Sequence, residues 1–527
     1  MDARRIARIR AWTEGLTIGA FVAALFAPMV DQVLRPSSAR DTVAEMRAPA
    51  RFPNAPRSAR ELIAFPARFE AWHKDTFGLR DLLLRGHSRL RLSVLRSSPT
   101  PSVVPGEGDW IFSTTNQAME DHRGELTTSP ALLAEWQRFL ERRRDYLAGR
   151  NIEYLLVVAP NKDEVYPERL ASSYAPVGPT RLDQLLRQLE QHSDVKVLDL
   201  RAALREEKRR DEGEDFCYYP LGTHWTDRGA YAGYAAVVRQ LALHRSGLAP
   251  LSRESFEVAR AGDQGDSWAA RLYLPGRLRQ ARFAWNLREP AATPREDPPN
   301  DRAAVYARSD GIARPRALLL HDSFGVQTRP MLAEHFSELD CTWAFDLGVA
   351  HLDAFRPDVV IQLYNESTLV RLMPVPTDEE DGGRAERRFE TSDEVLWKLR
   401  TGEDRPDGVE SDSAGSLTRD GGTLVFEPQR ESELLHLPEL EYPKDATLLL
   451  RIELETDEAG VLVVFFQTTY DPTFDRRRTL HRSFAAGRSS IYLVFPPSEA
   501  TGRLALHIGS MRARYRLHAL EIRRERS

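Results

Sequence analysis

The chain has 527 residues, of which 42% are hydrophobic and 29% are charged, and its formal net charge is only −5. This length predicts two or three domains, and the composition is typical of a soluble globular protein over most of the chain. The weak charge gives no basis for nucleic-acid binding. With only Cys217 and Cys341, the sequence excludes a disulfide scaffold and a CxxC metal site. The two thiols are either bridged in an oxidising compartment or buried and free, and we favour free thiols.

Residues 1–34 indicate a membrane anchor. Four arginines, the last of them Arg10, precede an apolar run from Gly15 to Val30 that has no polar face. A span needs about 20 residues, which the run reaches if it extends to Leu34. The basic flank should stay in the cytoplasm, which predicts a single-pass protein of the inner (cytoplasmic) membrane with its bulk in the periplasm or extracytoplasmic space. A cleaved signal peptide is the alternative, but Leu25 stands where a cleavage site ending at Ala27 needs a small residue.

Residues 35–60 are rich in Pro, Arg and Ser and predict a tether. From residue 129 onward, helices and strands alternate along the chain. Helical patterns cover 130–148, 180–191 and 226–244, and apolar strand patterns cover 152–160, 195–200, 316–321 and 356–364. This alternation predicts an α/β domain over 61–370 with a parallel sheet between helices, whose chemistry is expected at the carboxyl ends of the strands.

The last third of the chain has a different pattern. Residues 371–422 are dominated by Asp, Glu, Gly, Arg and Pro and predict a linker. Beyond residue 423 the period changes to two, as in the run 448–455, where apolar and charged residues alternate. Similar short runs recur up to residue 522, with turn residues between them. They predict an all-β module over 423–527, most simply a β-sandwich.

Two residues are candidates for nucleophilic catalysis. The segment "ALLLHDSFG" places Ser323 at the turn that follows a buried strand, where a hydroxyl is exposed and backbone N–H groups can bind an oxyanion. A serine needs a base, and His224 in "THWTDRGAY" lies at the start of a helix in the same α/β pattern. No other His, Asp or Glu stands at a metal-ligand spacing from His224, so the sequence predicts neither a metal nor a cofactor there.

Five segments in this order resemble the alginate O-acetyltransferase branch of the SGNH hydrolase-like family. They are "FPARFEAWHKDTFGLRDLLL", "VVPGEGDWIF", "VVAPNKDEVYPERL" with Pro160, Lys162, Tyr166 and Pro167, "THWTDRGAYAGY" with "HDSFG", and "RPDVVIQLYNES". The resemblance covers about residues 60–370. It implies an SGNH-type α/β/α fold outside the cytoplasmic membrane. It also implies acyl transfer to a polysaccharide through a Ser-His-Asp triad, with a membrane-bound O-acyltransferase as the partner that supplies acetyl groups.

Carried over to this sequence, Ser323 matches the nucleophile and His224 the base of that family. The family aspartate lies two residues before the histidine, and here Gly222 holds that place. Asp227 is one candidate to replace it, although an acidic residue in the first turn of a helix also favours the helix dipole. The alternatives are a backbone carbonyl that orients His224, which leaves a Ser-His dyad, or a protein that binds polymer without catalysis.

Further site candidates come from loops. The backbone N–H of Ser323 is one expected oxyanion donor. Asn161 and Asn365 follow strand ends and are side-chain candidates, each with a turn-forming role as the alternative. In the β-module, Tyr470 and Phe474 lie among arginines in one loop, an arrangement suited to sugar rings and acidic sugars, while ordinary turn residues would give the same pattern.

Three functions are compatible with these residues. The first is a membrane-anchored O-acetyltransferase that modifies a secreted or cell-surface polysaccharide. The second is a binding or assembly protein of an exopolysaccharide machine with a degenerate active site, which Gly222 favours. The third is a carbohydrate esterase, in which water replaces the sugar hydroxyl, because both reactions share the acyl-enzyme step. We favour the O-acetyltransferase.

Overall fold

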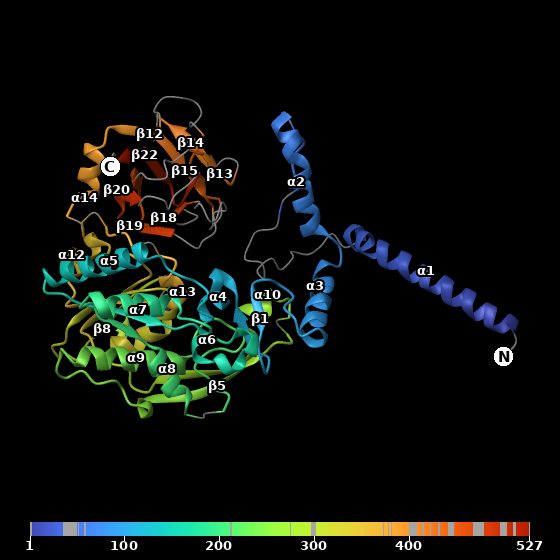
Figure 1. Ribbon diagram of the computed structural model, residues 1–527, viewed down its shortest axis with the longest axis horizontal. Coiled ribbons are helices and arrows are strands. Elements are labelled where there is room, and N and C mark those ends of the chain that lie inside the picture. Colours follow the sequence, from blue (N-terminus) through green and yellow to red (C-terminus); the bar gives the residue numbers. More distant parts are fainter. Residues whose placement is uncertain are drawn as a thin grey trace. The chain divides into compact units, whose positions relative to one another are not determined.

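The computed structural model describes residues 3–34, 50, 52–56, 59–210, 213–274, 276–296, 302–372, 374–377, 379–380, 382–399, 408–413, 416–421, 423–429, 433–440, 447–466, 479–495, 503–509 and 513–525. The chain forms two compact units (Figure 1). The first comprises residues 1–114, 219–223 and 260–282, and the second comprises residues 115–218, 224–259 and 283–527.

The first unit begins with the helix α1 (Ala3–Leu34). Its segment Trp12–Gln32 is 21 residues long with a mean hydropathy of 1.5, long and apolar enough to cross a membrane. An apolar helix of this length satisfies all its backbone hydrogen bonds internally, which is what a bilayer requires. The predicted N-terminal apolar helix is therefore present. Most of the predicted tether lies outside the described residues.

The rest of the first unit is small. It contains α2 (Ala59–Thr76), α3 (Arg80–Arg89), a π-helical turn at Leu90–Val94, the antiparallel hairpin of β1 (Val103–Pro105) and β2 (Ile111–Ser113), and α10 (Ser267–Arg271). Its core brings together three parts of the chain through Val103, Ile111, Leu221, Trp268 and Leu272. Segments that the sequence assigns to the α/β domain thus pack with the N-terminal part. Strands β5 (Phe256–Gln264) and β6 (Gln280–Leu287) form a separate two-stranded sheet.

The second unit is built on a seven-stranded sheet in the order β4-β3-β11-β9-β10-β8-β7. Neighbours from β4 to β10 are parallel, β8 is antiparallel to β10, and β7 is antiparallel to β8. The strands are β3 (Glu153–Ala159), β4 (Val197–Asp199), β7 (Ala292–Pro294), β8 (Ala303–Arg308), β9 (Arg316–His321), β10 (Glu338–Thr342) and β11 (Val359–Asn365). The α/β prediction is confirmed, with a mixed rather than a purely parallel sheet.

Helices cover this sheet. Those with capping signals in the sequence are α5 (Pro130–Ala148), α7 (Arg181–His192) and α9 (Asp227–Ala242), whose caps Ser129, Thr180 and Thr226 each accept a backbone N–H. The shorter ones are α4 (Ala118–His122), α6 (Lys162–Val165), α8 (Arg201–Lys208), α11 (Arg329–Ala333), α12 (Val349–Phe355) and α13 (Glu366–Leu369). Apolar residues of α5 and α7 pack on β3, with Trp136, Leu140, Leu185 and Val158 all buried.

Two antiparallel sheets form the C-terminal module of the second unit. One runs β14-β15-β22-β17-β20, with β12 paired to β22, and the other runs β13-β16-β21-β18-β19. The elements are α14 (Arg384–Thr391), β12 (Glu394–Lys398), β13 (Glu410–Ser411), β14 (Leu417–Asp420), β15 (Thr423–Phe426), β16 (Leu435–His436), β17 (Thr447–Thr456), β18 (Gly460–Phe466), β19 (Thr479–Phe484), β20 (Gly487–Phe495), β21 (Leu504–Ile508) and β22 (Tyr515–Glu525). The predicted all-β module is confirmed.

The module begins earlier than residue 423. Strands β12, β13 and β14 lie inside the predicted linker 371–422 and pair with strands of both sheets. These strands are short and carry several charged residues, so their composition is that of a loop. Their pairing with strands of the module, β12 with β22, β13 with β16 and β14 with β15, supplies the order that their own sequence does not indicate.

Candidate active site

Ser323 stands at the carboxyl end of β9, at the first position of a 3₁₀ helix, Ser323–Thr328. The preceding Asp322 holds this turn. One of its carboxylate oxygens accepts the backbone N–H of Phe324 at 2.9 Å, and the other accepts that of Asn365, at the end of β11, at 2.8 Å. The buried carboxylate therefore ties the ends of two neighbouring strands together and presents the Ser323 side chain at the sheet edge.

Close packing under the turn explains why a glycine follows. A Cβ atom on Gly325 would lie 2.4 Å from the Cβ of His321, so any side chain there would displace the turn. His321 is fully buried, and its Nδ1 lies 2.6 Å from the carbonyl oxygen of Asp322. Burial, aided by repulsion from Arg329, lowers the pKa of His321 to about 3. The imidazole is therefore neutral and donates Nδ1–H to that carbonyl.

His224 is placed by the segment that leads into α9. Tyr218 and Trp225 form an antiparallel bridge, and the Thr226 backbone N–H donates to the carbonyl of Cys217 at 3.0 Å. Motif residues near β3 hold this segment: the Tyr218 hydroxyl donates to the Pro160 carbonyl at 2.5 Å, and the Cys217 N–H donates to the Tyr166 hydroxyl at 2.9 Å. Trp225 is completely buried, which anchors the residue next to His224.

These two segments bring the candidate pair together. The Nε2 atom of His224 lies 2.8 Å from the Oγ atom of Ser323, although 99 residues separate them in the chain. The ring of Phe324 packs against the imidazole, with ring centroids 5.3 Å apart. A histidine nitrogen at this distance can accept the hydroxyl proton while the oxygen attacks an acyl carbon.

The electrostatics of the turn involve Asp322. Burial raises the pKa of this carboxyl, while hydrogen bonds from the backbone of Asn365 and Phe324 and the attraction of His224 act in the opposite direction. The backbone bonds engage the carboxylate form and favour it. Asp322 therefore serves first as a structural brace for the nucleophile turn.

The other candidates lie in different environments. Asp227 begins α9, and its Oδ2 accepts the backbone N–H of Trp285 at 3.2 Å. The amide group of Asn365 donates to the carbonyls of Ala159 and Pro160, and its oxygen caps α13 through the N–H of Ser367, so its bonds are those of a strand-end brace. Asn161 directly precedes α6, and its backbone N–H donates to Glu366 at 3.3 Å. Tyr470 and Phe474 lie outside the described residues.

Gly222, the position where the family has an aspartate, is buried against another carboxylate. A Cβ atom on Gly222 would lie 2.8 Å from both the carboxylate carbon and Oδ2 of Asp266. Asp266 is held there by Arg282 at 2.6 Å and Gln280 at 2.9 Å, and it also accepts the N–H of Ser267. The space of the missing side chain is thus filled by a carboxylate from a distant segment, which no motif in the sequence indicates.

Neither cysteine forms a disulfide. Cys217 and Cys341 are both buried and free, as the sequence favours. Burial raises the pKa of the Cys217 thiol to about 12, so it is protonated and unreactive at neutral pH.

Comparison with known proteins places the site in context. Residues 103–282 match the family model described as the SGNH hydrolase-like domain of acetyltransferase AlgX. Pseudomonas aeruginosa AlgX shares 15% identity at a TM-score of 0.40, covering 80% of this chain and 94% of that chain. The O-acetyltransferase domain of Pseudomonas putida AlgJ shares 22% identity at a TM-score of 0.34, and the match covers 51% of this chain and 91% of that chain. Bacillus cereus PatB1 shares 14% identity at a TM-score of 0.40, and the match covers 51% of this chain and 96% of that chain. No curated protein matches the chain. The family match supports an acetyltransferase or related function for this domain.

Proposed function

We propose that this chain, whose residues 103–282 match the SGNH hydrolase-like domain of acetyltransferase AlgX, is an extracytoplasmic O-acetyltransferase that modifies a polysaccharide. The observation that carries the proposal is the distance of 2.8 Å between His224 Nε2 and Ser323 Oγ at the carboxyl edge of the sheet. A nucleophile and a base at this spacing suit transfer through a covalent acyl-enzyme.

The reaction proceeds in two balanced halves. In the first, Ser323 Oγ forms a bond to the acyl carbon of the donor while His224 Nε2 takes the hydroxyl proton, and the donor's leaving group departs with that proton. In the second, a sugar hydroxyl attacks the acyl carbon, His224 takes its proton, and the bond to Ser323 Oγ breaks. The proton returns to Ser323, which restores the enzyme.

The remaining parts of the proposal concern location and partners. The apolar helix α1 anchors the chain in the inner membrane, with the catalytic unit on the extracytoplasmic side. A membrane-bound O-acyltransferase supplies the acetyl groups there, and the C-terminal β-module contributes to polymer binding. An alginate-like polymer is the acceptor that the AlgX match favours.

The test uses the full chain in detergent with 4-nitrophenyl acetate as the donor and a polysaccharide fragment as the acceptor. Ser323→Ala and His224→Ala should each lower the rate of acetyl transfer by ~10³-fold or more, because the two groups act as one unit. Ser337→Ala and His351→Ala are matched controls outside the site and should retain the rate. Mass spectrometry of the wild type should detect an acetyl group on Ser323, and the proposal fails if neither variant loses activity.

A second candidate is an assembly protein that binds polymer without chemistry. The replacement of the family aspartate by Gly222 favours it. If the unmodified chain neither acetylates nor deacetylates any sugar yet binds polymer, this candidate replaces the first. Release of free acetate from an acetylated sugar, without transfer to an acceptor, would instead identify an esterase.

A further inference from the structure

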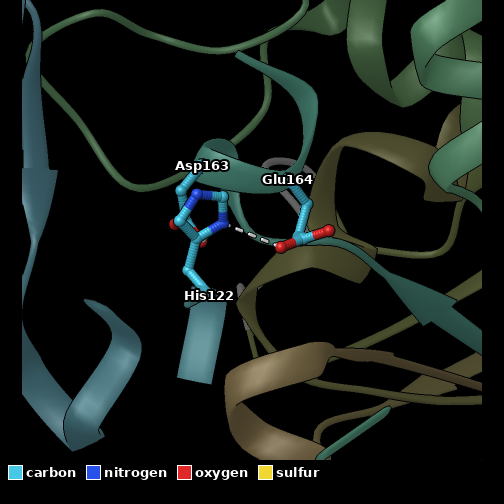
Figure 2. A group of neighbouring side chains, drawn as sticks. All are labelled: His122, Asp163 and Glu164. Atoms are coloured by element: carbon cyan, nitrogen blue, oxygen red, sulfur yellow. Dashed lines mark hydrogen bonds and ion pairs between the residues drawn. The ribbon is translucent and has the colours of Figure 1, made fainter. Parts of the chain in front are cut away.

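A second group of buried polar side chains lies apart from Ser323 and His224. His122 is the last residue of α4, and Asp163 and Glu164 lie in α6, directly after β3. All three residues are buried, with between 4% and 7% of their surface exposed. The Nδ1 atom of His122 lies 2.9 Å from Glu164 Oε1 and 3.4 Å from Asp163 Oδ2. Figure 2 shows the imidazole reaching from α4 to both carboxylates.

The Asp163 carboxylate is not satisfied by these contacts. Its Oδ2 atom has no hydrogen-bond partner among the described residues, although the side chain is 4% exposed and faces His122. A buried carboxylate oxygen without a partner carries a desolvation cost. Burial raises the pKa of Asp163 to about 7, against the attraction of the His122 imidazole. The site therefore contains an acceptor that no group in the described part of the chain completes.

Two arginines contact one carboxylate oxygen of Glu164, and the other oxygen faces His122. The Oε2 atom of Glu164 faces Arg205 Nη2 at 3.4 Å and Arg201 Nη1 at 3.7 Å, while Oε1 points to His122. Arg201 also forms ion pairs with Asp183 and Asp199, each with an N···O distance of 2.8 Å. These arginines orient the carboxylate from one side, and its other oxygen and Asp163 Oδ2 meet at the imidazole.

We propose that His122, Asp163 and Glu164 bind a divalent transition-metal ion, with Zn²⁺ as the best fit. One ligand atom from each residue lies within 4.8 Å of the others. Atoms about 2.1 Å from one tetrahedral ion lie about 3.4 Å apart, close to the two distances from His122 Nδ1. One imidazole nitrogen and two carboxylate oxygens form a ligand set that suits Zn²⁺. The same set suits Mn²⁺ when further oxygen ligands are added. Water would complete the coordination of either ion.

The ion would have a structural role at the reactive edge of the sheet. It would join α4 to α6, at the carboxyl end of β3. Asn161, just before α6, donates its backbone N–H to the carboxylate of Glu366. The residue before Glu366 is Asn365, whose backbone N–H donates to Asp322. Metal binding would thus stabilise the strand ends that carry the Ser323 turn, with no part in the chemistry of acyl transfer.

The test uses the full-length, untagged chain in detergent, stripped of metal with a chelator. Titration calorimetry with ZnCl₂ and with MnCl₂ should show one ion per chain, with Zn²⁺ the tighter, and Zn²⁺ should raise the midpoint of thermal unfolding. Asp163→Asn keeps the shape of the side chain and should weaken binding by ~10-fold or more, because it replaces an anionic ligand with a neutral amide. Glu164→Gln should weaken it similarly.

Asp340→Asn is the matched control. Asp340 pairs with His351 at 2.9 Å, so the change removes a histidine-bound carboxylate elsewhere and should leave the affinity unchanged. In the metal-free state, Asp163→Asn should fold at least as stably as the wild type, since it removes an unsatisfied buried carboxylate. The proposal is overturned if the wild-type chain binds no ion, or if Asp163→Asn and Glu164→Gln bind Zn²⁺ as tightly as the wild type does.

Discussion

At the scale of single residues, the candidate active site depends on contacts that each involve one atom pair. His224 Nε2 meets Ser323 Oγ at 2.8 Å, and the backbone N–H groups of Phe324 and Asn365 hold the carboxylate of Asp322 beneath the turn. At Gly222, the absence of a side chain matters as much as a contact, because the carboxylate of Asp266 occupies that space. Within the same unit as His224 and Ser323, Asp227 is the candidate for a third catalytic carboxylate.

A substitution of Asp227 tests this candidate. We expect Asp227→Asn to lower kcat by less than about 10-fold, because that carboxylate accepts the N–H of Trp285 and begins a helix. A loss of ~10³-fold or more would instead identify a triad carboxylate, since loss of such a group costs about 10⁴ elsewhere. Acetyl-transfer kinetics of the full chain measure the effect.

The control for Asp227→Asn is Asp340→Asn. Asp340 pairs with His351 at 2.9 Å outside the site, so this variant should retain the rate. A large loss in Asp227→Asn with an unchanged control would assign the role of the third carboxylate to Asp227, and a small loss would indicate a Ser-His dyad.

At the scale of secondary-structure elements, α9 is the helix that positions the base. Its start packs closely on the preceding segment, since a Cβ atom on Gly229 would lie 2.1 Å from the carbonyl oxygen of Cys217. Further along, the Tyr234 hydroxyl accepts the N–H of Leu251 at 2.8 Å and lies 2.5 Å from Nε2 of His335, after α11. The hydroxyl can donate its proton to this nitrogen only when His335 is neutral.

This contact predicts a pH dependence of stability. Burial, with repulsion from Arg314 and Arg308, lowers the pKa of His335 to about 4. The unfolded chain binds a proton at this residue below about pH 6.5, and the folded chain only below about pH 4. The contribution of neutral His335 to folding is therefore lost as the pH falls from about 6.5 to about 4. Between pH 7 and 4.5, the wild type should lose about 1–3 kcal/mol more unfolding free energy than His335→Gln.

Urea unfolding of the full chain in detergent at both pH values measures this difference. His244→Gln, at an exposed position beyond α9, is the control and should follow the wild type. If His335→Gln loses as much stability on acidification as the wild type, His335 is not the group responsible. The buried residues His321 and His481, whose pKa values burial lowers to about 3, contribute equally to both proteins and cancel.

At the scale of the whole molecule, the chain joins a membrane-type helix, a mixed α/β sheet and two antiparallel sheets. Each unit takes its core from distant parts of the chain: Val103, Leu221 and Trp268 pack together in the first unit. In the second, the buried ion pair of Arg143 with Glu380, at 2.6 Å, ties α5 to a segment beyond the α/β sheet. The order of these parts along the chain predicts a topology that can be measured.

An alkaline phosphatase reporter fused after residue 60 should be active, because that enzyme folds only outside the cytoplasm. Green fluorescent protein fused before residue 1 should fluoresce, since a basic flank such as the one with Arg10 is expected on the cytoplasmic side. The full chain should remain in the membrane fraction after a high-salt wash, because the apolar surface of Trp12–Gln32 holds it there. Recovery of a soluble chain that begins near residue 28 would replace the anchor with a cleaved signal peptide.

The sequence by itself predicted the elements that depend on interactions between residues close together in the chain. The apolar run of α1, the caps Ser129 and Thr226, the buried strands β3, β9 and β11, and the alternating strand β17 were all predictable from periodicity and capping. Motif resemblance singled out Ser323 and His224. Each of these signals is contained in one short segment of the chain, so its hydrogen bonding and hydrophobic spacing can be read directly from the sequence.

Only the tertiary structure decided what depends on packing between distant segments. It brought Ser323 within 2.8 Å of His224, filled the space beside Gly222 with Asp266, and joined His122 to Asp163 and Glu164. It also ordered the short strands β12–β14 by pairing them with strands β22, β16 and β15 of the C-terminal module. The physical reason is that these contacts are selected by the burial of whole faces, and no spacing within one segment encodes which distant residue will meet it.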